Sequence, residues 1–303
     1  MGRTYPALVH RLLRWVIRSL PRFPKVWRLR HHALNVRSVR FRERLVRTRV
    51  LGGPSLWVKP NDLIGRHIFY DGVWEGSTTR HFYDGLRPGD VVLDVGANIG
   101  QYTVLAAKKV GPRGRVFAVE PGEETRRILD MNISTNGLSN VSIFSVAAWD
   151  ADTELFLDVG EADNCGSAGV RVGPAERTTA ATVPARRLGP LLRAAGCDRI
   201  DILKIDIEGA ELPALRGLDD FFRDSPPRAV YCELLGGHPR FGASATDLFD
   251  FFDHHGYRAR AFGDGGLTPF SRSQIGPDTM VNVLFELDRS VGSGRPFPPA
   301  GPS

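Results

Sequence analysis

Cysteine is scarce in this chain of 303 residues, and long apolar runs are missing. The three cysteines, Cys165, Cys197 and Cys232, lie far apart and form no CxxC pair. Their spacing argues against a disulfide framework or a zinc knuckle and makes a reducing cytosol the expected compartment. No apolar stretch reaches the roughly 18 residues that a membrane span requires. We therefore expect a cytoplasmic protein, and its apolar content of 42% is ample for a packed core.

Acidic residues are nearly absent from the first 50 positions. That segment contains 14 Lys and Arg and one acid, Glu43, although the whole chain has a net charge of only +6. The remainder of the chain is therefore net negative. From residue 8 onward apolar side chains recur at helical spacing between Arg11, Arg14 and Arg18, which predicts a basic amphipathic segment over residues 1–50.

Three roles for residues 1–50 follow from this composition. An amphipathic basic helix could make peripheral contact with an anionic membrane at its cytoplasmic face, or dock on its own catalytic domain. Binding of nucleic acid is a third and less favoured role. The interrupting arginines and the lack of a small-residue cleavage site argue against a signal peptide.

From residue 91 onward the chain becomes regular. Short apolar runs recur, and helix-like stretches separate most of them: "VVLDV", "RVFAVE", "VSIFSV", "DILKID", "RAVYCE" and "VNVLFEL". Such alternation predicts a mainly parallel sheet with helices on both faces. We assign residues 51–290 to this domain. The Pro-, Gly- and Ser-rich tail, residues 291–303, is predicted to be disordered.

The turn "DVGANIG" after the first run lacks the second glycine of a dinucleotide fingerprint, because Asn98 takes its place. Gly96 and Gly100 would let the backbone approach a ligand. Asp94 would repel a phosphate but attract an ammonium group, and Glu120, at the end of the second run, suits ribose hydroxyls. A ligand with an amino-acid end and a ribose is S-adenosylmethionine. The turn therefore predicts a methyl-donor site.

Further motifs join this turn. With "DVGANIGQYT", "VEP" at 119–121 and "KIDIEGAE" at 204–211, the sequence resembles the FkbM-type S-adenosylmethionine-dependent methyltransferases over about residues 55–288. The resemblance implies an α/β class I methyltransferase (Rossmann-like) fold with a seven-stranded, mainly parallel sheet. It also implies O-methylation of a hydroxyl on a sugar, glycolipid or polyketide-type metabolite. Thr153 departs from the family pattern, which often has glycine there.

The acceptor hydroxyl needs a base within hydrogen-bond reach. Strand alternation would send Asp206 and Glu208 to one side, at the carboxyl end of a strand beside the cofactor. Their repulsion would raise one pKa, or the pair could hold a divalent metal. Glu233 closes the next strand and His238 follows it. We expect Asp206 or His238 to be the base, with Glu208 and Glu233 positioning the substrate or a metal.

Five further residues complete the predicted site. Glu75 and His81 are expected to cover the substrate side. Ala97 belongs to the cofactor turn, while Ala147 and Asp150 follow the third strand, where the family places adenine. There Asp150 would accept a hydrogen bond from the adenine amino group.

Two other functions stay open. An RNA methyltransferase could hold phosphate through residues 1–50, although the two acids of "IDIEGAE" stand where a polyanion would approach. A non-catalytic S-adenosylmethionine-binding scaffold is the other alternative. The joint presence of Asp94, Glu120, Asp206 and Glu208 argues against a lost activity.

Overall fold

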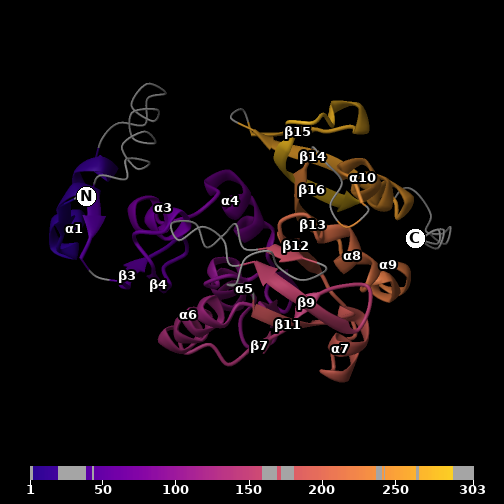
Figure 1. Ribbon diagram of the computed structural model, residues 1–303, viewed down its shortest axis with the longest axis horizontal. Coiled ribbons are helices and arrows are strands. Elements are labelled where there is room, and N and C mark those ends of the chain that lie inside the picture. Colours follow the sequence, from indigo (N-terminus) through magenta and orange to yellow (C-terminus); the bar gives the residue numbers. More distant parts are fainter. Residues whose placement is uncertain are drawn as a thin grey trace.

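A computed structural model describes residues 3–19, 39–42, 44–158, 169–171, 181–236, 241, 243–263 and 266–288. At its centre lies an eight-stranded mixed sheet (Figure 1). In spatial order its strands are β15 (Gly266–Pro269), β14 (Tyr257–Gly263), β16 (Met280–Leu287), β13 (Ala229–Leu235), β12 (Ile202–Ile205), β5 (Val91–Val95), β6 (Arg115–Val119) and β7 (Val141–Phe144). The five strands from β13 to β7 are parallel, whereas β16 is antiparallel to both of its neighbours.

The six apolar runs of the sequence all form strands of this sheet, as predicted. The predicted number of seven strands is wrong by one. The additional strand is β15, which folds back on β14 as an antiparallel edge hairpin. Its four residues, "GLTP", carry no alternating apolar pattern and so give no strand signal.

The order of the strands reverses between β5 and β12. From β5 the chain continues outward to β6 and β7, and it returns to the other side of β5 to form β12 and β13. In an open parallel sheet, ligands bind beyond the carboxyl ends of the strands at such a switch point. The fold therefore places the expected ligand site next to the β5 turn.

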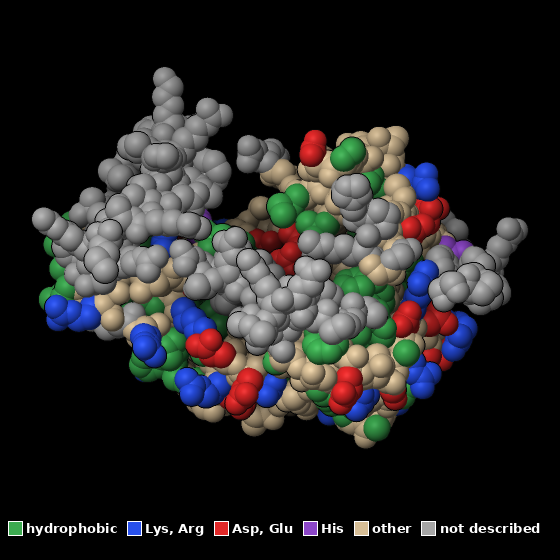
Figure 2. Space-filling model, in the orientation of Figure 1, with side chains coloured by type: hydrophobic (Ala, Val, Ile, Leu, Met, Phe, Trp, Pro, Cys, Tyr) green, Lys and Arg blue, Asp and Glu red, His purple; other side chains and the backbone are tan. Residues whose placement is uncertain are grey.

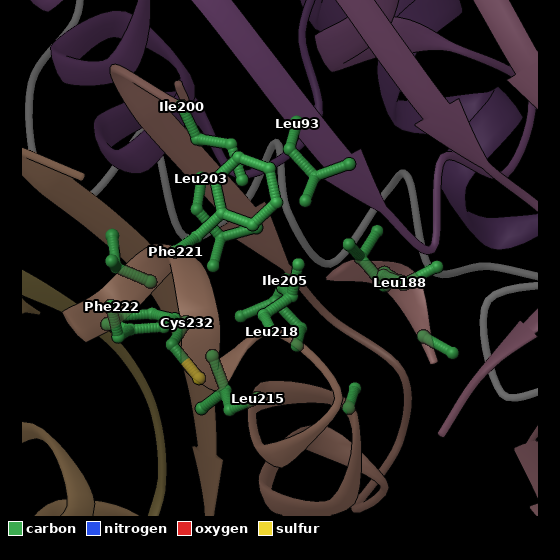
Figure 3. Packing of buried hydrophobic residues seen from close by; sticks show 14 of the residues in the cluster. Leu93, Leu188, Ile200, Leu203, Ile205, Leu215, Leu218, Phe221, Phe222 and Cys232 are labelled. Carbon is green, nitrogen blue, oxygen red and sulfur yellow. The ribbon is translucent and has the colours of Figure 1, made fainter. Parts of the chain in front are cut away.

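Helices cover both faces of the sheet (Figure 1). One face carries α4 (Gly76–Gly85), α5 (Gln101–Val110) and α6 (Glu123–Thr135). The opposite face carries α7 (Leu188–Ala194), α8 (Glu211–Arg216), α9 (Asp219–Asp224) and α10 (Ala245–His254). Figure 3 shows the core of this second face, where Phe221 and Phe222 of α9 pack with Leu203 and Cys232 of the sheet. This burial fixes the carboxyl ends of β12 and β13 in place.

A second, four-stranded sheet follows the third parallel strand, where the sequence showed only a Gly-, Ala- and Thr-rich piece. Its order is β10 (Gly169–Arg171), β9 (Thr153–Asp158), β11 (Ala181–Arg186) and β8 (Ala147–Ala148). Leu155, Val183 and Ala185 from this sheet are buried together with Trp149. The second sheet thereby forms one wall of the site described below.

The N-terminal elements lie at one end of the long axis of the molecule (Figure 1). They are β1 (Arg3–Tyr5), α1 (Ala7–Ser19), β2 (Val39–Phe41), β3 (Val46–Arg49), β4 (Ser55–Val58) and α3 (Leu63–Asp71). The short 3-10 helix η2 (Arg272–Gln274) instead packs near α10, where Arg272 pairs with Asp250. Among the described residues no helix combines the length and apolar character needed to cross a membrane. The tail predicted to be disordered, residues 291–303, lies outside the described residues.

Candidate active site

The turn between β5 and α5 needs glycine at two positions. Gly96 has φ 80° and Gly100 has φ 89°, both in the left-handed region. A Cβ on Gly96 would overlap the backbone oxygen of Asp206, and one on Gly100 would overlap the side chain of Leu129. The turn is therefore packed directly against the loop that follows β12. Asn98 also has a positive φ, 51°, and its Oδ1 accepts a hydrogen bond from the amide of Ile99 at 2.7 Å.

Glu120, at the end of β6, is buried and anchors this turn. Its Oε2 accepts from the amide of Asn98 at 2.8 Å. Its Oε1 accepts from the amide of Gly122 and the hydroxyl of Thr125, both at 2.8 Å. Burial raises the pKa of Glu120, while these three donors oppose the shift. A carboxylate has about four acceptor positions, so one position on Oε2 is left for a ligand hydroxyl.

A cavity of about 330 Å³ opens between this turn, the second sheet and the end of β12. Five of the predicted site residues line it: Gly96, Asn98, Glu120, Ala147 and Asp206. Residues that the sequence analysis did not single out complete the wall, among them Lys59, Thr125, Leu157 and Val170. The wall of the cavity combines carboxylates, such as Glu120 and Asp206, with small apolar residues, such as Ala147 and Ala148.

This donor set fits S-adenosylmethionine. Glu120 offers a hydroxyl acceptor, Ala147 and Ala148 leave room for a flat ring, and a Cβ on Gly96 would fill the space beside Asp206. Four other residues predicted to meet the cofactor do not line the cavity. Asp94, Ala97 and Gly100 are buried behind the turn, and Asp150 is exposed on the surface.

A charge pair with a buried lysine lies at the wall of the cavity. Lys204 of β12 is in register with Asp94 of β5, and its Nζ lies 3.0 Å from Oδ2 of Asp206. Burial alone would lower the pKa of Lys204, but the carboxylates of Asp206, Glu75 and Asp94 outweigh it and raise the pKa. Burial raises the pKa of Asp94 to about 6, against the opposing effects of a 2.5 Å hydrogen bond from Thr103 and of Lys204. Lys204 thus stays a cation beside Asp206.

Four acidic side chains from separate parts of the chain meet at the carboxyl end of β12 and β13. The pKa of Glu233 is raised to about 9 by burial first, and then by the charges of Asp206, Glu208 and Glu75. These charges act only over short distances, so the four residues form one carboxylate cluster. In the space-filling view acidic side chains gather in the hollow at the centre of this face (Figure 2).

Glu75 is fixed in this cluster by two distant residues. Its Oε2 accepts from the hydroxyl of Tyr102 at 2.8 Å, and its Oε1 accepts from Nδ2 of Asn282 at 2.6 Å. Asn282 lies opposite Glu233 in the β13–β16 pairing, and its Oδ1 is buried with no hydrogen-bond partner in the described part of the chain. At neutral pH the protonated Glu233 could supply the missing donor. Neither Tyr102 nor Asn282 was predicted to belong to the site. Both are distant from Glu75 in the sequence, so no local pattern connects them with it.

The prediction that strand alternation places Asp206 and Glu208 side by side is wrong in its mechanism. The strand β12 ends at Ile205, and Glu208 has a left-handed backbone with φ 58°. Glu211, in the first turn of α8, shapes this loop. Its Oε1 accepts from the amides of Ile207 at 2.9 Å and Gly209 at 3.2 Å.

One predicted residue, His81, stands apart from the cluster. His81 packs lower on α4, where its Nδ1 lies 2.9 Å from the hydroxyl of Tyr231 and its ring meets Phe262 edge-on. His238 lies outside the described residues. In the described ranges no group of three or more His, Cys, Asp or Glu side chains is arranged to hold a metal.

The chain matches proteins of known class over this same region. The model of the methyltransferase FkbM domain matches residues 94–259. The AMB antimetabolite synthetase AmbE of Pseudomonas aeruginosa is 34% identical over 282 residues, which cover 80% of this chain but only 13% of that protein. Methyltransferase sdnD of Sordaria araneosa is 28% identical over 47% of this chain and 66% of its own length.

Solved structures also align. A SAM-dependent O-methyltransferase from Thermotoga maritima aligns with a TM-score of 0.40 and 14% identity, over 80% of this chain and 78% of that one. A putative O-methyltransferase from Klebsiella pneumoniae gives 0.41 and 13%, over 71% and 81%. The strand order of the present chain is that of a class I methyltransferase with one added edge strand. The chain belongs to the FkbM methyltransferase family, whose members are S-adenosylmethionine-dependent.

Proposed function

We propose that the chain transfers a methyl group to a hydroxyl oxygen of a sugar, glycolipid or polyketide-type metabolite. One observation carries the proposal. Asp206 lines the cofactor cavity beside the Gly96 turn, and it also belongs to the carboxylate cluster. A carboxylate at the boundary of the two regions is placed to act on an acceptor hydroxyl.

The chain's own residues would hold the cofactor and the acceptor separately. The turn at Gly96, the amide of Asn98, the carboxylate of Glu120 and the small side chain of Ala147 would bind the cofactor. When bound, S-adenosylmethionine supplies an electrophilic methyl group on a sulfonium. Holding the acceptor in line with that group accounts for up to about 7–11 kcal/mol of the barrier in favourable cases.

Asp206 is the proposed base. The ammonium of Lys204 lies 3.0 Å away, and the side chain of Asp206 is 29% exposed and so accessible to an acceptor. It takes the proton that the hydroxyl loses. Glu233, with a pKa of about 9, retains its proton at neutral pH and can donate a hydrogen bond to another oxygen of a polyhydroxyl acceptor. The cluster thus offers both an acceptor and a donor.

The test follows the methyl group. The protein is incubated with methyl-labelled S-adenosylmethionine and host-cell extract, the extract is fractionated, and the labelled product is examined by NMR. We expect label in the lipid, glycan or small-metabolite fraction, on an oxygen. Label in nuclease-sensitive material, or on nitrogen or carbon, would overturn the proposal.

Two matched variants test whether Asp206 acts as the base. Asp206→Asn should keep the affinity for S-adenosylmethionine measured by calorimetry and lose turnover by about 10²–10⁴-fold, the usual contribution of a general base. Asp150→Asn, an exposed change outside the cavity, should leave both quantities unchanged. Full turnover in Asp206→Asn would remove Asp206 from the base role.

A further inference from the structure

The helix α1 is docked on the protein in an unusual orientation. Its outward face carries large apolar side chains: Leu8 is 77% exposed, Leu12 66% and Trp15 68%. These positions follow the i, i+4, i+7 spacing of a single helix face, and Val9, at 49%, lies beside them. A helix that only completed the protein core would bury this face. The apolar face of α1 therefore points to a partner outside the described fold.

The opposite face of α1 is the one that docks, and its contacts are polar and aromatic. The ring of His10 stacks on Phe41 with centroids 3.5 Å apart, and its Nδ1 lies 2.6 Å from the hydroxyl of Tyr70. Arg14 donates to the hydroxyl of Thr48 and to the backbone oxygen of Arg49. These contacts hold the helix on β2, β3 and α3.

The charge around α1 identifies the partner. Arg11, next to the apolar face, is exposed, and residues 1–50 hold 14 basic residues and one acid. An apolar face with flanking cations is the pattern of a helix that lies in the interface of an anionic bilayer, where apolar side chains enter the acyl boundary and arginines meet lipid headgroups. A second copy of this chain would bring its own cations against those of the first.

We propose that α1 is a surface anchor for an anionic membrane, with Leu8, Leu12 and Trp15 inserted and Arg11 at the headgroups. His10 and Arg14 hold α1 on α3 and β3. Lys59, which lies between β4 and α3, lines the cofactor cavity, so one short stretch of chain connects the anchor with the site. The proposal does not depend on which atom the enzyme methylates. Its test requires no acceptor.

The experiment is vesicle flotation with the full chain. The vesicles are phosphatidylcholine alone or phosphatidylcholine with about 30 mol% phosphatidylglycerol. We expect binding to the anionic vesicles only. Leu8→Glu/Leu12→Glu should lower the partition by at least about 10-fold, since each buried leucine contributes roughly that factor or more. Arg11→Glu should lower it less and weaken its dependence on salt.

The control is Met280→Glu, which places the same charge on an equally exposed apolar side chain, 74% exposed, on β16. It should bind vesicles like the wild type. Unchanged affinity for S-adenosylmethionine in every variant confirms that each is folded. If the wild type fails to float, or if Leu8→Glu/Leu12→Glu floats like the wild type, the proposal is wrong. Dissociation of a dimer by the same double variant, seen in sedimentation without lipid, would assign the face to a second copy instead.

Discussion

Lys204 and Asp206 form an ion pair at the carboxyl end of β12, in which the lysine side chain is fully buried and the aspartate reaches the cavity. Lys204 Nζ lies 3.0 Å from Asp206 Oδ2, and the same lysine faces Asp94 across the β5–β12 pairing. The ammonium of Lys204 therefore balances the charge of two carboxylates, that of Asp94 on the neighbouring strand and that of Asp206 just after β12. The lysine side chain is only 2% exposed, so water cannot replace it.

Replacing this lysine should destabilise the fold strongly. Lys204→Met leaves Asp94 and Asp206 without their cation in a buried region, and breaking such a pair costs about 3–5 kcal/mol. Urea unfolding measures the change. The matched control is Lys59→Met, which breaks the 2.7 Å pair with Glu124, whose side chain is 69% exposed. That pair should contribute about 0–1 kcal/mol. Equal effects of the two substitutions would show that Lys204 is not a structural cation.

The raised pKa of Glu233 predicts a dependence of stability on pH. In the folded chain Glu233 keeps its proton up to a pKa of about 9, whereas the unfolded chain loses it near 4.5. Between these values the folded state binds more protons than the unfolded state, so the free energy of unfolding falls as pH rises. Glu233→Gln carries no such proton. Its melting temperature should rise relative to that of the wild type between pH 5 and pH 9.

The size of that effect is shared within the carboxylate cluster. We expect a gain on the order of 1–3 kcal/mol at pH 9, because interacting carboxyls titrate as a group. Glu154→Gln, an exposed change on β9, controls for the loss of one negative charge. A difference in melting temperature between Glu233→Gln and the wild type that stays constant with pH would contradict the raised pKa.

Much of the fold could be predicted because its signals are local. The strand β5, which contains Asp94, and the glycine turn after it are encoded in consecutive residues, and both were placed correctly. The edge strand β15 could not be predicted, since its four residues show no apolar alternation and it is held by pairing with β14. Long-range pairing, rather than local propensity, forms that strand.

The candidate site, like the fold, contains residues that could be predicted from the sequence and residues that could not. Glu120 and Ala147 follow directly from their position at strand ends and do line the cavity. The partners of Glu75 could not be found, because Asn282 lies 207 positions away and only the β13–β16 pairing brings it close. Asp150 shows that the position of a residue along the chain does not determine where its side chain points. It stands at the expected position along the chain, yet its side chain is exposed because the loop directs it to solvent.

The Gly96 turn should not accept a side chain. Gly96→Ala would place Cβ on the backbone oxygen of Asp206, at a residue whose φ of 80° is already unfavourable for alanine. We expect loss of S-adenosylmethionine binding and a destabilisation of several kcal/mol, more than the roughly 1–2 kcal/mol that the left-handed backbone alone costs. Gly89→Ala separates the two effects, because Gly89 has φ 87° and nothing within 4 Å of its Cβ. Equal behaviour of the two variants in calorimetry and urea unfolding would exclude the steric contact.

Glu120 should determine cofactor affinity without affecting the methyl transfer step. In Glu120→Gln the amide NH₂ must face either the amide of Asn98 or the donors of Gly122 and Thr125, so one donor meets another. The loss of a charged hydrogen bond costs about 1.5–3 kcal/mol, which is roughly a 10–100-fold weaker affinity for S-adenosylmethionine. Turnover at saturating cofactor should stay near that of the wild type, because Glu120 lies apart from the carboxylate cluster. Glu124→Gln alters the same cavity wall at an exposed position and should change the affinity by less than about 2-fold. If Glu120→Gln instead lowered turnover and left affinity intact, the roles assigned to the cofactor cavity and the carboxylate cluster would have to be exchanged.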